Sequence, residues 1–504
     1  MAEPRGRVRV HLHDLLAGLD GVELTGDPNV EVTAITHDSR LVEPGACFAC
    51  IPGALADGHA YAAAAVAAGA VALLAERPLA LEVSQARVPS VRRALGPVSA
   101  SFFGHPSRAL RCLGVTGTNG KTTTTYLLEA IARGAAERVG VIGTVGVRIA
   151  GEPIESQHTT PEATELQQIL ARMRDSGVTT VAMEVSSHAL DQHRVDGTWF
   201  EAACFTNLSH EHLDHHGTIE AYFEAKAALF DPGRVGAGAV NADDPYGLAL
   251  VQRARARGLA VSTFGIDSKT ADLTAVELVP DPKGTRFTLV DRGAGVRIDV
   301  ELPLIGAFNV ANALAAATTA RVAGFDLDAI GAGLRAPIVI PGRFERVETG
   351  QPFSVFVDYA HTPDALSRVL QAARTLTSGA GSTGRVIVVF GCGGDRDHAK
   401  RPLMGEAVAR GADLAVLTSD NPRSEDPQAI VDAVLPGFGR RSAPVAVQLD
   451  RRAAIAQAFA EATAGDVVVI AGKGHETGQT SGTITVPFDD RVVAREELRA
   501  LGWS

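Results

Sequence analysis

The sequence is poor in cysteine, in net positive charge and in long apolar stretches. It has five cysteines in 504 residues, a small and odd number that favours the reducing cytoplasm over a disulfide-bonded secreted protein. Its 47 Lys and Arg are outnumbered by 58 Asp and Glu, which gives a formal net charge of -11. This balance argues against a broad nucleic-acid-binding surface, so an anionic ligand would need a local pocket of positive charge.

No apolar stretch is long enough to predict a membrane span. The longest, Tyr61 to Ala75, is mostly alanine and falls short of the roughly 20 residues that a spanning helix needs. A helix that turns at Gly69 into a strand explains it better. The first residues, MAEPRGRVRVHLHDLL, carry basic side chains without an apolar segment after them, which does not fit a secretory signal. We therefore expect a cytoplasmic protein without a membrane span.

One C-x-x-C pair, Cys47 and Cys50, raises the question of zinc or redox chemistry. No second pair follows it, and the surrounding GACFACIPG alternates like a strand that enters a turn. Zinc sites built on such a pair usually need another pair of cysteines or histidines. We interpret both cysteines as packed side chains.

The length of the chain predicts several domains. A prior of about 150 residues per domain suggests roughly three, and Pro106 follows a first region of short apolar runs and turns. From RCLGVTG onward apolar strands alternate with helical segments, which predicts right-handed βαβ units on a mostly parallel sheet. The pattern restarts after IVIPGRFERV. We therefore expect three α/β domains at 1–106, 107–340 and 341–504, with a mobile loop at Thr377 to Gly384.

The segment GVTGTNGKTTTT resembles a phosphate-binding loop between a strand and a helix. Gly117 and Gly120 would let the backbone turn and aim N–H groups at phosphate oxygens. Lys121 would reach the terminal phosphates, and the hydroxyl of Thr122 or Thr123 would reach Mg²⁺. Val115 stands where the common pattern has its first glycine. The alternative is a glycine turn beside a surface lysine, but the order of strand, loop, Lys-Thr and helix favours a nucleotide site.

Two further segments follow strands of the same predicted sheet. Glu184 ends the apolar strand VAMEV, where a carboxylate can hold Mg²⁺ or simply be a solvated strand end. The next segment places four histidines within seven residues: His210, His212, His215 and His216. Asp214 occupies the place of the second histidine of an H-E-x-x-H zinc site, which excludes that motif. One of these histidines can join Glu184 at a metal, and from position alone we choose His212.

In the last predicted domain, three charged residues follow strands: Arg396, Arg423 and Glu476. The carboxyl ends of parallel strands collect ligands, so these side chains are candidates to bind one polar molecule with both signs of charge. A guanidinium group grips a carboxylate through two parallel hydrogen bonds, and two arginines therefore suggest more than one acid group. Surface ion pairs are the alternative.

Taken together, these segments resemble the Mur ligases, the ATP-dependent amide-bond-forming enzymes of bacterial peptidoglycan assembly. GTNGKTT matches the family's own nucleotide loop, which lacks the first glycine of the common pattern. The match continues through HTTPEA, EVSSHAL, TNLSHEHLDHHGT, YFEAKAALF, GAFNVANALAA, GRFE, DYAHTPDAL, GCGGDRD, DNPRSEDP and GKGHE. It extends from about residue 36 to about residue 476 and includes all three predicted domains.

The resemblance implies an N-terminal domain for a UDP-linked substrate, a central P-loop-type ATPase domain with a mostly parallel sheet, and a C-terminal Rossmann-like domain for an amino acid. It is strongest to members that add meso-diaminopimelate to UDP-N-acetylmuramoyl-L-Ala-D-Glu through an acyl phosphate, with ATP as a substrate and Mg²⁺ as cofactor. In those members an arginine of D-N-P-R binds the distal carboxylate, which lysine lacks. The implied diaminopimelate site comprises Arg396, Asp420, Asn421, Pro422, Arg423, Gly472 and Glu476.

The resemblance also implies the other site residues. The UDP-linked substrate would meet Ser39, Thr159, Thr160, Ser186, Gln192 and Arg194. ATP would meet Gly117, Thr118, Asn119, Gly120, Lys121, Thr122, Thr123, Asn309, Asn312, Arg343 and Asp358. Metal ligands would be Thr122, Thr123, Glu184, His212 and Lys226, and Lys226 would be carbamylated. Lys121, Lys226 and His212 would be the catalytic residues.

The resemblance leaves alternatives to be tested. One is a related ligase that adds lysine or a dipeptide, or a polyglutamate synthetase that acts on folate; D-N-P-R and HTTP argue against these. Another is an ATP-binding regulator that keeps the fold and has lost catalysis, which the intact Lys121, Glu184, His212 and Lys226 disfavour. We expect a monomer that does not bind nucleic acid and has no membrane span.

Overall fold

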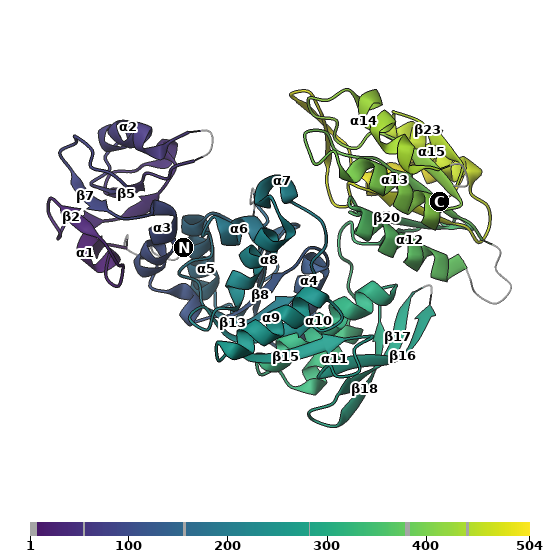
Figure 1. Ribbon diagram of the computed structural model, residues 1–504, viewed down its shortest axis with the longest axis horizontal. Helices are drawn as coiled ribbons and strands as arrows, with labels where there is room; N and C mark the ends of the chain where they lie inside the picture. The colour runs from purple at the N-terminus through teal and green to yellow at the C-terminus, as the bar shows by residue number, and fades with distance from the viewer. Residues whose placement is uncertain are drawn as a thin grey trace, which may run out of the picture.

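The computed structural model describes residues 8–53, 56–154, 158–281, 283–377, 384–439 and 443–503. Its three largest sheets follow one another along the chain and lie in a row, from the purple N-terminal part to the green and yellow C-terminal part (Figure 1). This arrangement confirms the three-part α/β fold class. Most of the loop that we expect to be mobile, residues 378–383, lies outside the described residues.

The N-terminal part contains a five-stranded sheet. Its elements are β1 (Val10–His11), α1 (Leu12–Leu15), β2 (Glu23–Thr25), β3 (Glu31–Val32), β4 (Ala34–Thr36), η1 (Ser39–Leu41), β5 (Ala46–Ala49), η2 (Gly58–Tyr61), α2 (Ala62–Ala67), β6 (Ala72–Ala75), β7 (Ser84–Arg87), α3 (Val91–Phe102) and η3 (Pro106–Arg108). The order is β2-β7-β6-β5-β4, and all neighbours except β2 and β7 are parallel. The alanine-rich run is indeed a helix, α2, followed by a strand, β6.

The two cysteines of the C-x-x-C pair are packing residues. Cys47 lies in β5 and Cys50 just after it, and both are buried and free. Burial raises the pKa of each thiol to about 12, so neither is a reactive thiolate near neutral pH. This confirms the interpretation from sequence.

The central part is built on an eleven-stranded sheet. Its strands are β8 (Arg111–Thr116), β9 (Val139–Gly143), β10 (Gly146–Ile149), β11 (Glu152–Ile154), β12 (Thr180–Glu184), β13 (Phe200–Phe205), β14 (Val235–Asn241), β15 (Ala260–Gly265), β16 (Leu273–Asp281), β17 (Gly284–Asp291) and β18 (Val296–Leu302). Its helices are α4 (Lys121–Gly134), α5 (Ala163–Asp175), α6 (Ser187–Asp191), α7 (Leu213–His216), α8 (Ile219–Ala227), η4 (Ala228–Phe230), α9 (Pro245–Ala256), α10 (Ala307–Val322) and α11 (Leu327–Arg335).

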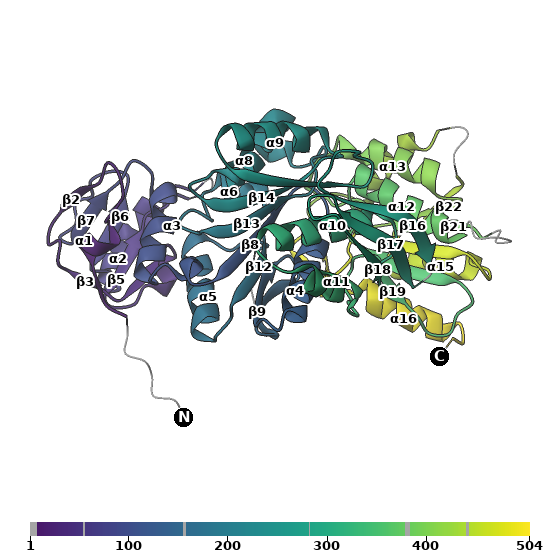
Figure 2. The ribbon, with the colours of Figure 1, turned by 90° about the horizontal axis from the view of Figure 1, so that it is seen from below.

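Strand β8 lies in the parallel centre of this sheet. The order is β11-β10-β9-β12-β8-β13-β14-β15-β16-β17-β18, and the strands from β9 to β16 are parallel (Figure 2). Both edges are antiparallel hairpins. Alternate residues of β8 serve two cores: Leu113 and Val115 pack with α4 and α10, whereas Cys112 packs with α5. Because both faces are covered, the carboxyl-terminal edge is the side left open for a ligand.

The C-terminal part contains a six-stranded sheet. Its elements are β19 (Glu345–Val347), β20 (Ser354–Asp358), α12 (Pro363–Thr377), β21 (Val386–Phe390), α13 (Lys400–Gly411), β22 (Leu414–Leu417), α14 (Pro427–Val434), η5 (Leu435–Gly437), β23 (Val445–Val447), α15 (Arg451–Glu461), β24 (Val467–Ala471), β25 (Gly478–Ser481), β26 (Ile484–Pro487) and α16 (Asp490–Ala500). The order is β19-β20-β24-β21-β22-β23, parallel except at β19. No helix in the described part of the chain combines the length and apolar character that crossing a bilayer requires.

Candidate active site

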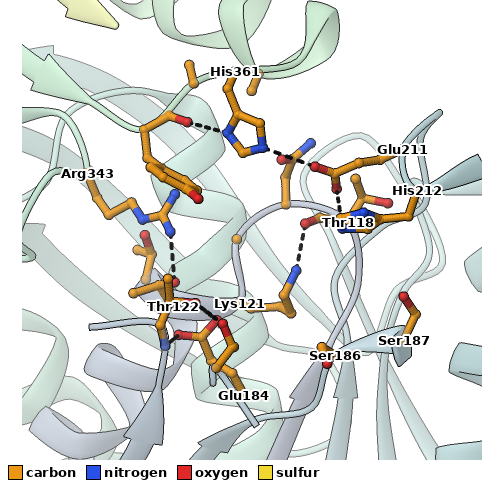
Figure 3. A pocket seen from close by; sticks show the side chains of 18 of the residues that line it. Thr118, Lys121, Thr122, Glu184, Ser186, Ser187, Glu211, His212, Arg343 and His361 are labelled. Atoms are coloured by element: carbon orange, nitrogen blue, oxygen red, sulfur yellow. Dashed lines mark hydrogen bonds and ion pairs between the residues drawn. The ribbon is translucent and has the colours of Figure 1, made fainter. Parts of the chain in front are cut away.

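A cavity of about 560 Å³ lies between the central and C-terminal parts of the chain. The central part lines it with the loop at 118–123 and with the ends of strands such as β12. The C-terminal part lines it with residues 358–361, at the end of β20 and just after it, and with Arg396, which follows β21. Figure 3 shows side chains from both parts pointing toward one another across this space. Residues from separate sheets therefore share one site.

The loop between β8 and α4 is braced by the segment that follows the neighbouring strand β13. The backbone N–H groups of Thr118 and Asn119 donate to the main-chain oxygen and to Oδ1 of Asn207, both at 2.9 Å. Gly117 has a φ of +144°, and a side chain there would collide with the hydroxyl of Thr206. The bend of the loop is thus held by the protein itself. The sequence pattern did not single out Thr206 or Asn207, although both stand directly after an apolar strand.

Lys121 folds back over the loop that precedes it. Its Nζ donates to the main-chain oxygen of Gly117 at 2.8 Å and to that of Thr118 at 2.8 Å (Figure 3). The side chain is half-buried, and desolvation lowers its pKa below the usual value for lysine. A phosphate group would supply stronger, charged acceptors than these carbonyls, so Lys121 is placed to exchange them for an anion.

Lys226, on α8, is a buried lysine without an ion-pair partner among the described residues. Its Nζ donates to the main-chain oxygen of Gly117 at 2.8 Å and lies 4.4 Å from the centre of the Tyr222 ring. Burial, with the nearby charge of Lys121, holds its pKa well below the usual value. An unpaired buried cation is costly, and the site therefore favours the neutral amine.

Glu184, at the end of β12, is buried and oriented by Thr144. The Thr144 N–H donates to Oε1 at 2.8 Å, and its hydroxyl donates to Oε2 at 3.0 Å. The same hydroxyl lies 3.2 Å from that of Thr159. Glu184 is therefore not a solvated strand end, and Thr144, which the sequence pattern did not single out, fixes its carboxylate beside the phosphate loop.

The histidine cluster separates into different environments. His215 and His216 are held by Asp191 and by the Ser187 hydroxyl, at 2.9 and 3.0 Å, whereas His212 lines the cavity. The His212 backbone is left-handed, with a φ of 57°, and its ring lies edge-on to His188 with centroids 4.8 Å apart. Burial lowers the pKa of His212 to about 4, so it is a neutral imidazole near neutral pH, the form that binds metals.

The donors at this edge fit Mg²⁺. Among the described residues no three His, Cys, Asp or Glu side chains are placed to hold a metal ion by themselves. Mg²⁺ is usually bound by one or two carboxylates together with waters and substrate phosphates. The Glu184 carboxylate and the buried hydroxyls of Thr122 and Thr123 are oxygen donors of this kind. The set therefore suits an ion that arrives with a phosphate ligand.

Glu211 connects the two parts of the cavity. Its Oε1 lies 3.3 Å from Nε2 of His361, and its Oε2 lies 3.7 Å from Nε2 of His212 (Figure 3). The hydrogen bond from His361 and neighbouring positive charge outweigh burial and hold the pKa of Glu211 well below its usual range. The sequence pattern drew attention to the histidines on either side of Glu211 and missed the carboxylate between them.

Arg343 also reaches across the cavity. Its Nη2 donates to the Thr122 hydroxyl at 3.1 Å, and its guanidinium stacks 4.5 Å from the centre of the Tyr359 ring. Asp358, at the end of β20, shapes this region by accepting the backbone N–H of Phe344 at 2.7 Å. Burial raises the pKa of Asp358. Arg343 and Asp358 both line the cavity, as their assignment to one ligand requires.

The two asparagines of α10 differ in position. Asn312 lines the cavity, whereas Asn309 lies behind it, donating to the Ile305 carbonyl at 2.9 Å and accepting from Asn312 at 3.2 Å. Asn309 therefore orients Asn312 from outside the cavity. Separately, Asn119 of the phosphate loop donates to Asp364 of α12 at 3.0 Å.

The residues expected for the UDP-linked substrate also divide into those that line the cavity and those that lie outside it. Arg194 donates to the Thr160 carbonyl at 3.1 Å and to Gln192 Oε1 at 2.7 Å, and its Nε lies 3.0 Å from Glu162, which the sequence pattern did not single out. Ser39 lies in η1 of the N-terminal part and is not one of the residues that line the cavity. Those that do line it are Thr159, Thr160, Ser186, Gln192 and Arg194.

Three loops of the C-terminal sheet carry the residues expected for the amino acid. Arg396, after β21, is exposed and lines the cavity. Arg423, after β22, has a left-handed backbone with a φ of 51°, and its Nη1 donates to the Gly394 carbonyl at 2.7 Å. Asn421 donates to Oε2 of Glu476, after β24, at 2.8 Å. The loops from three strands thus contact one another, as the placement of these residues after strands predicts.

The chain matches three parts of one family in order. Residues 31–102 match the Mur ligase family, catalytic domain; residues 115–320 match the Mur ligase middle domain; and residues 342–474 match the Mur ligase, glutamate ligase domain.

Relatives extend the match over nearly the whole length of the chain. The UDP-N-acetylmuramoyl-L-alanyl-D-glutamate--2,6-diaminopimelate ligase of Streptomyces coelicolor is 48% identical over 482 residues, 94% of each chain. A solved structure of a ligase of that same name has a TM-score of 0.71 and 36% identity, and covers 98% of this chain and 100% of its own. The folylpolyglutamate synthase of Mycobacterium tuberculosis has a TM-score of 0.60 at 21% identity, over 80% and 93% of the two chains, which shows a shared fold. The chain belongs to the Mur ligase family.

Proposed function

We propose that the protein is an ATP-dependent ligase of peptidoglycan biosynthesis that joins meso-2,6-diaminopimelate to the D-Glu side-chain carboxylate of UDP-N-acetylmuramoyl-L-Ala-D-Glu. The observation that carries the proposal is a single cavity lined by Lys121 of the phosphate loop and by Arg396 of the C-terminal part. The names of full-length relatives at 48% and 36% identity support the choice of substrates.

The proposed reaction has two steps. The D-Glu carboxylate attacks the γ-phosphorus of ATP, forming an acyl phosphate and releasing ADP. The neutral amine of diaminopimelate then attacks the acyl carbon, and the tetrahedral intermediate collapses to the amide with loss of a proton and phosphate. A carboxylate is a poor acyl donor until it is phosphorylated, so ATP is a reactant in this scheme and not a regulator.

The residues of this chain have roles matched to those steps. Lys121 moves from its loop carbonyls to the phosphates and stabilises charge on the transferred phosphoryl group. Mg²⁺, when bound, would neutralise further phosphate charge; Thr122, Thr123, Glu184 and His212 would hold it. The contacts of Arg343, Asn312 and Asp358 at the same cavity support their assignment to ATP.

Lys226 is assigned a carbamate. Its neutral amine would add CO₂ and release one proton, giving a carbamate anion that can bind a second Mg²⁺. Burial, a lowered pKa and the lack of an ion-pair partner among the described residues support this assignment. The carbonyl of Gly117, 2.8 Å away, would then face the nitrogen that remains a hydrogen-bond donor.

The acceptor end is assigned to the C-terminal loops. Arg396 and Arg423 would grip carboxylates of diaminopimelate, and Glu476 would bind its distal ammonium group. L-Lysine lacks the distal carboxylate, and its side-chain ammonium would face an arginine with no compensating charge. The D-N-P-R segment, Asp420 to Arg423, therefore supports diaminopimelate over lysine.

We further assign the UDP-linked substrate to 1–106, ATP to 107–340 and the amino acid to 341–504, in a monomer of the cytoplasm. The five free, buried cysteines support that compartment. The decisive experiment measures phosphate release from ATP with UDP-N-acetylmuramoyl-L-Ala-D-Glu, comparing meso-diaminopimelate with L-lysine and determining the product mass. Turnover with diaminopimelate alone is expected. Preference for lysine would overturn the acceptor assignment, and no turnover with either would favour a regulator that has lost catalysis.

A further inference from the structure

Lys473 is a fully buried lysine, with 0% of its side chain exposed, placed among the loops assigned to the acceptor amino acid. Its Nζ donates to Asn421 Oδ1 at 3.2 Å, to Glu476 Oε2 at 3.2 Å and to the Gly478 carbonyl at 2.6 Å. An ammonium group has three donors, and all three are used. A buried ammonium group whose three donors all have acceptors is held in one position.

Lys473 fixes which way the Asn421 side chain faces. Asn421 Oδ1 accepts from Lys473 and from the backbone N–H of Thr480 at 3.0 Å. Both partners are donors, so the amide oxygen must face them and the amide nitrogen must face Glu476. That nitrogen donates to Glu476 Oε2 at 2.8 Å.

The same lysine leaves one oxygen of Glu476 for a ligand. Oε2 of Glu476 accepts from both Lys473 and Asn421. No hydrogen bond to Oε1 is found among the described residues, and the Glu476 side chain is 33% exposed, whereas Lys473 is covered. The carboxylate is therefore clamped on its inner side and presents its outer oxygen.

The third contact of Lys473 anchors the hairpin of β25 and β26 against the D-N-P-R loop. Gly478 begins β25. Within this hairpin, the Thr480 carbonyl accepts the Arg423 N–H at 3.0 Å, and Gln479 donates to the Asp420 carbonyl at 2.8 Å. The backbone of Arg423, in its left-handed conformation, is thus paired to a strand that Lys473 holds in place.

The backbone around Lys473 allows this inward direction. Gly472 has a φ of +117°, and a Cβ there would lie 2.5 Å from Asp420 Oδ2. Glycine is therefore required for the chain to leave β24 this close to the D-N-P-R loop. Lys473, the residue that follows Gly472, is thereby placed next to Asn421.

We propose that Lys473 is a positioning residue for the acceptor amino acid: it clamps Asn421 and Glu476 into one unit and ties the hairpin to Arg423. The inference rests on the proposed function, because it concerns the site assigned to meso-diaminopimelate. Lys473 does not touch the ligand in this scheme. It acts through Glu476, which binds the ammonium group, and through the loop that carries Arg423.

The test compares apparent KM values for all three substrates in the wild type, in Lys473→Met, and in Lys269→Met as a matched control with an exposed lysine of the central part. Lys473→Met is expected to raise the KM for meso-diaminopimelate about tenfold to a hundredfold, the loss typical of a charge-assisted hydrogen bond. The KM values for ATP and the UDP-linked substrate should stay within about twofold, as should all values for the control.

A double-mutant cycle separates positioning from general damage. If Lys473 acts through Glu476, then Lys473→Met should change the KM for diaminopimelate less than about threefold in a Glu476→Gln background. The inference would be overturned if the two substitutions raised the KM for diaminopimelate independently, so that their effects multiplied in the double variant. An unchanged KM in Lys473→Met, or a loss confined to kcat, would also overturn it. If Lys473→Met does not fold, Lys473→Gln replaces it; failure of both to fold would make Lys473 purely structural and overturn the proposal. A wild type that never turns over diaminopimelate would instead refute the proposed function.

Discussion

Glu211 of the central part and His361 of the C-terminal part face each other, with Oε1 3.3 Å from Nε2. The other ring nitrogen of His361 lies 2.7 Å from the Tyr359 carbonyl, so both ring nitrogens face acceptors. The contact therefore joins two parts of the chain that share one cavity.

Weakening this pair should make closure of the C-terminal part onto the central part less favourable. We expect His361→Gln to lower kcat/KM about fivefold to tenfold, since a partly exposed contact to a carboxylate contributes about 1 kcal/mol. Small-angle scattering should show a smaller radius of gyration for the wild type with nucleotide and UDP-linked substrate than without, and a reduced change in the variant. Identical wild-type profiles in both conditions would count against closure.

Replacing Lys121 should remove ATP turnover. Lys121→Ala is expected to reduce phosphate release at least about a hundredfold, because a positioned charge on the transferred phosphoryl group is lost. Lys269→Ala, at an exposed position of the same part of the chain, serves as the control. Near-normal activity of Lys121→Ala would refute the assigned role.

The proposed carbamate on Lys226 makes activity depend on dissolved CO₂. We expect wild-type activity to fall when CO₂ and bicarbonate are removed and to return when they are restored, and Lys226→Ala to lose at least about a hundredfold. Carbon-13 NMR with labelled bicarbonate should give a carbamate signal in the wild type that is missing in the variant. Full activity of Lys226→Ala would refute the proposed carbamate on Lys226.

Glu425 should make stability depend on acid pH. Its carboxylate accepts from Arg401 at 2.8 Å and from the Asp395 N–H at 2.6 Å, and the Arg401 hydrogen bond lowers its pKa to about 2. Because the folded pKa lies below the unfolded value of about 4.3, the stabilisation is complete above that value and is lost as the pH falls toward 2.

We therefore expect Glu425→Gln to lower the melting temperature at pH 7 by about 2 to 4 °C. The difference in melting temperature between the variant and the wild type should narrow below about pH 4. Calorimetry from pH 7 to pH 3 measures both, with the exposed Glu152→Gln as control. A gap that stays constant down to pH 3 would contradict the assignment.

The strand and helix pattern and the phosphate loop were predictable from sequence because each depends on neighbouring residues. The continuous apolar run of β8, followed by Gly117, Gly120 and Lys121, is local information. Glu184 and Arg396 could also be placed, since the ends of parallel strands share one edge of a sheet.

Contacts that depend on packing across the sheets could not be predicted. Nothing near Glu211 in the sequence announces His361, 150 residues away, and Lys473 reads as part of a glycine-rich turn until its three acceptors are seen. Thr144 orients Glu184 from the turn after β9, a strand that is a neighbour of β12 in space only. Ser39 shows the reverse case, because it lies in η1 of the N-terminal part, whose position relative to the cavity no local pattern encodes.

Three loops assigned to the acceptor all follow strands of the C-terminal sheet, while the phosphate loop follows a strand of the central one. Recognition of the incoming amino acid and activation of the carboxylate are thus encoded in separate stretches of chain. An engineer who wanted another amino acid at this step would redesign the turns after β21, β22 and β24 as one transplantable set, and would leave the energy-supplying machinery untouched.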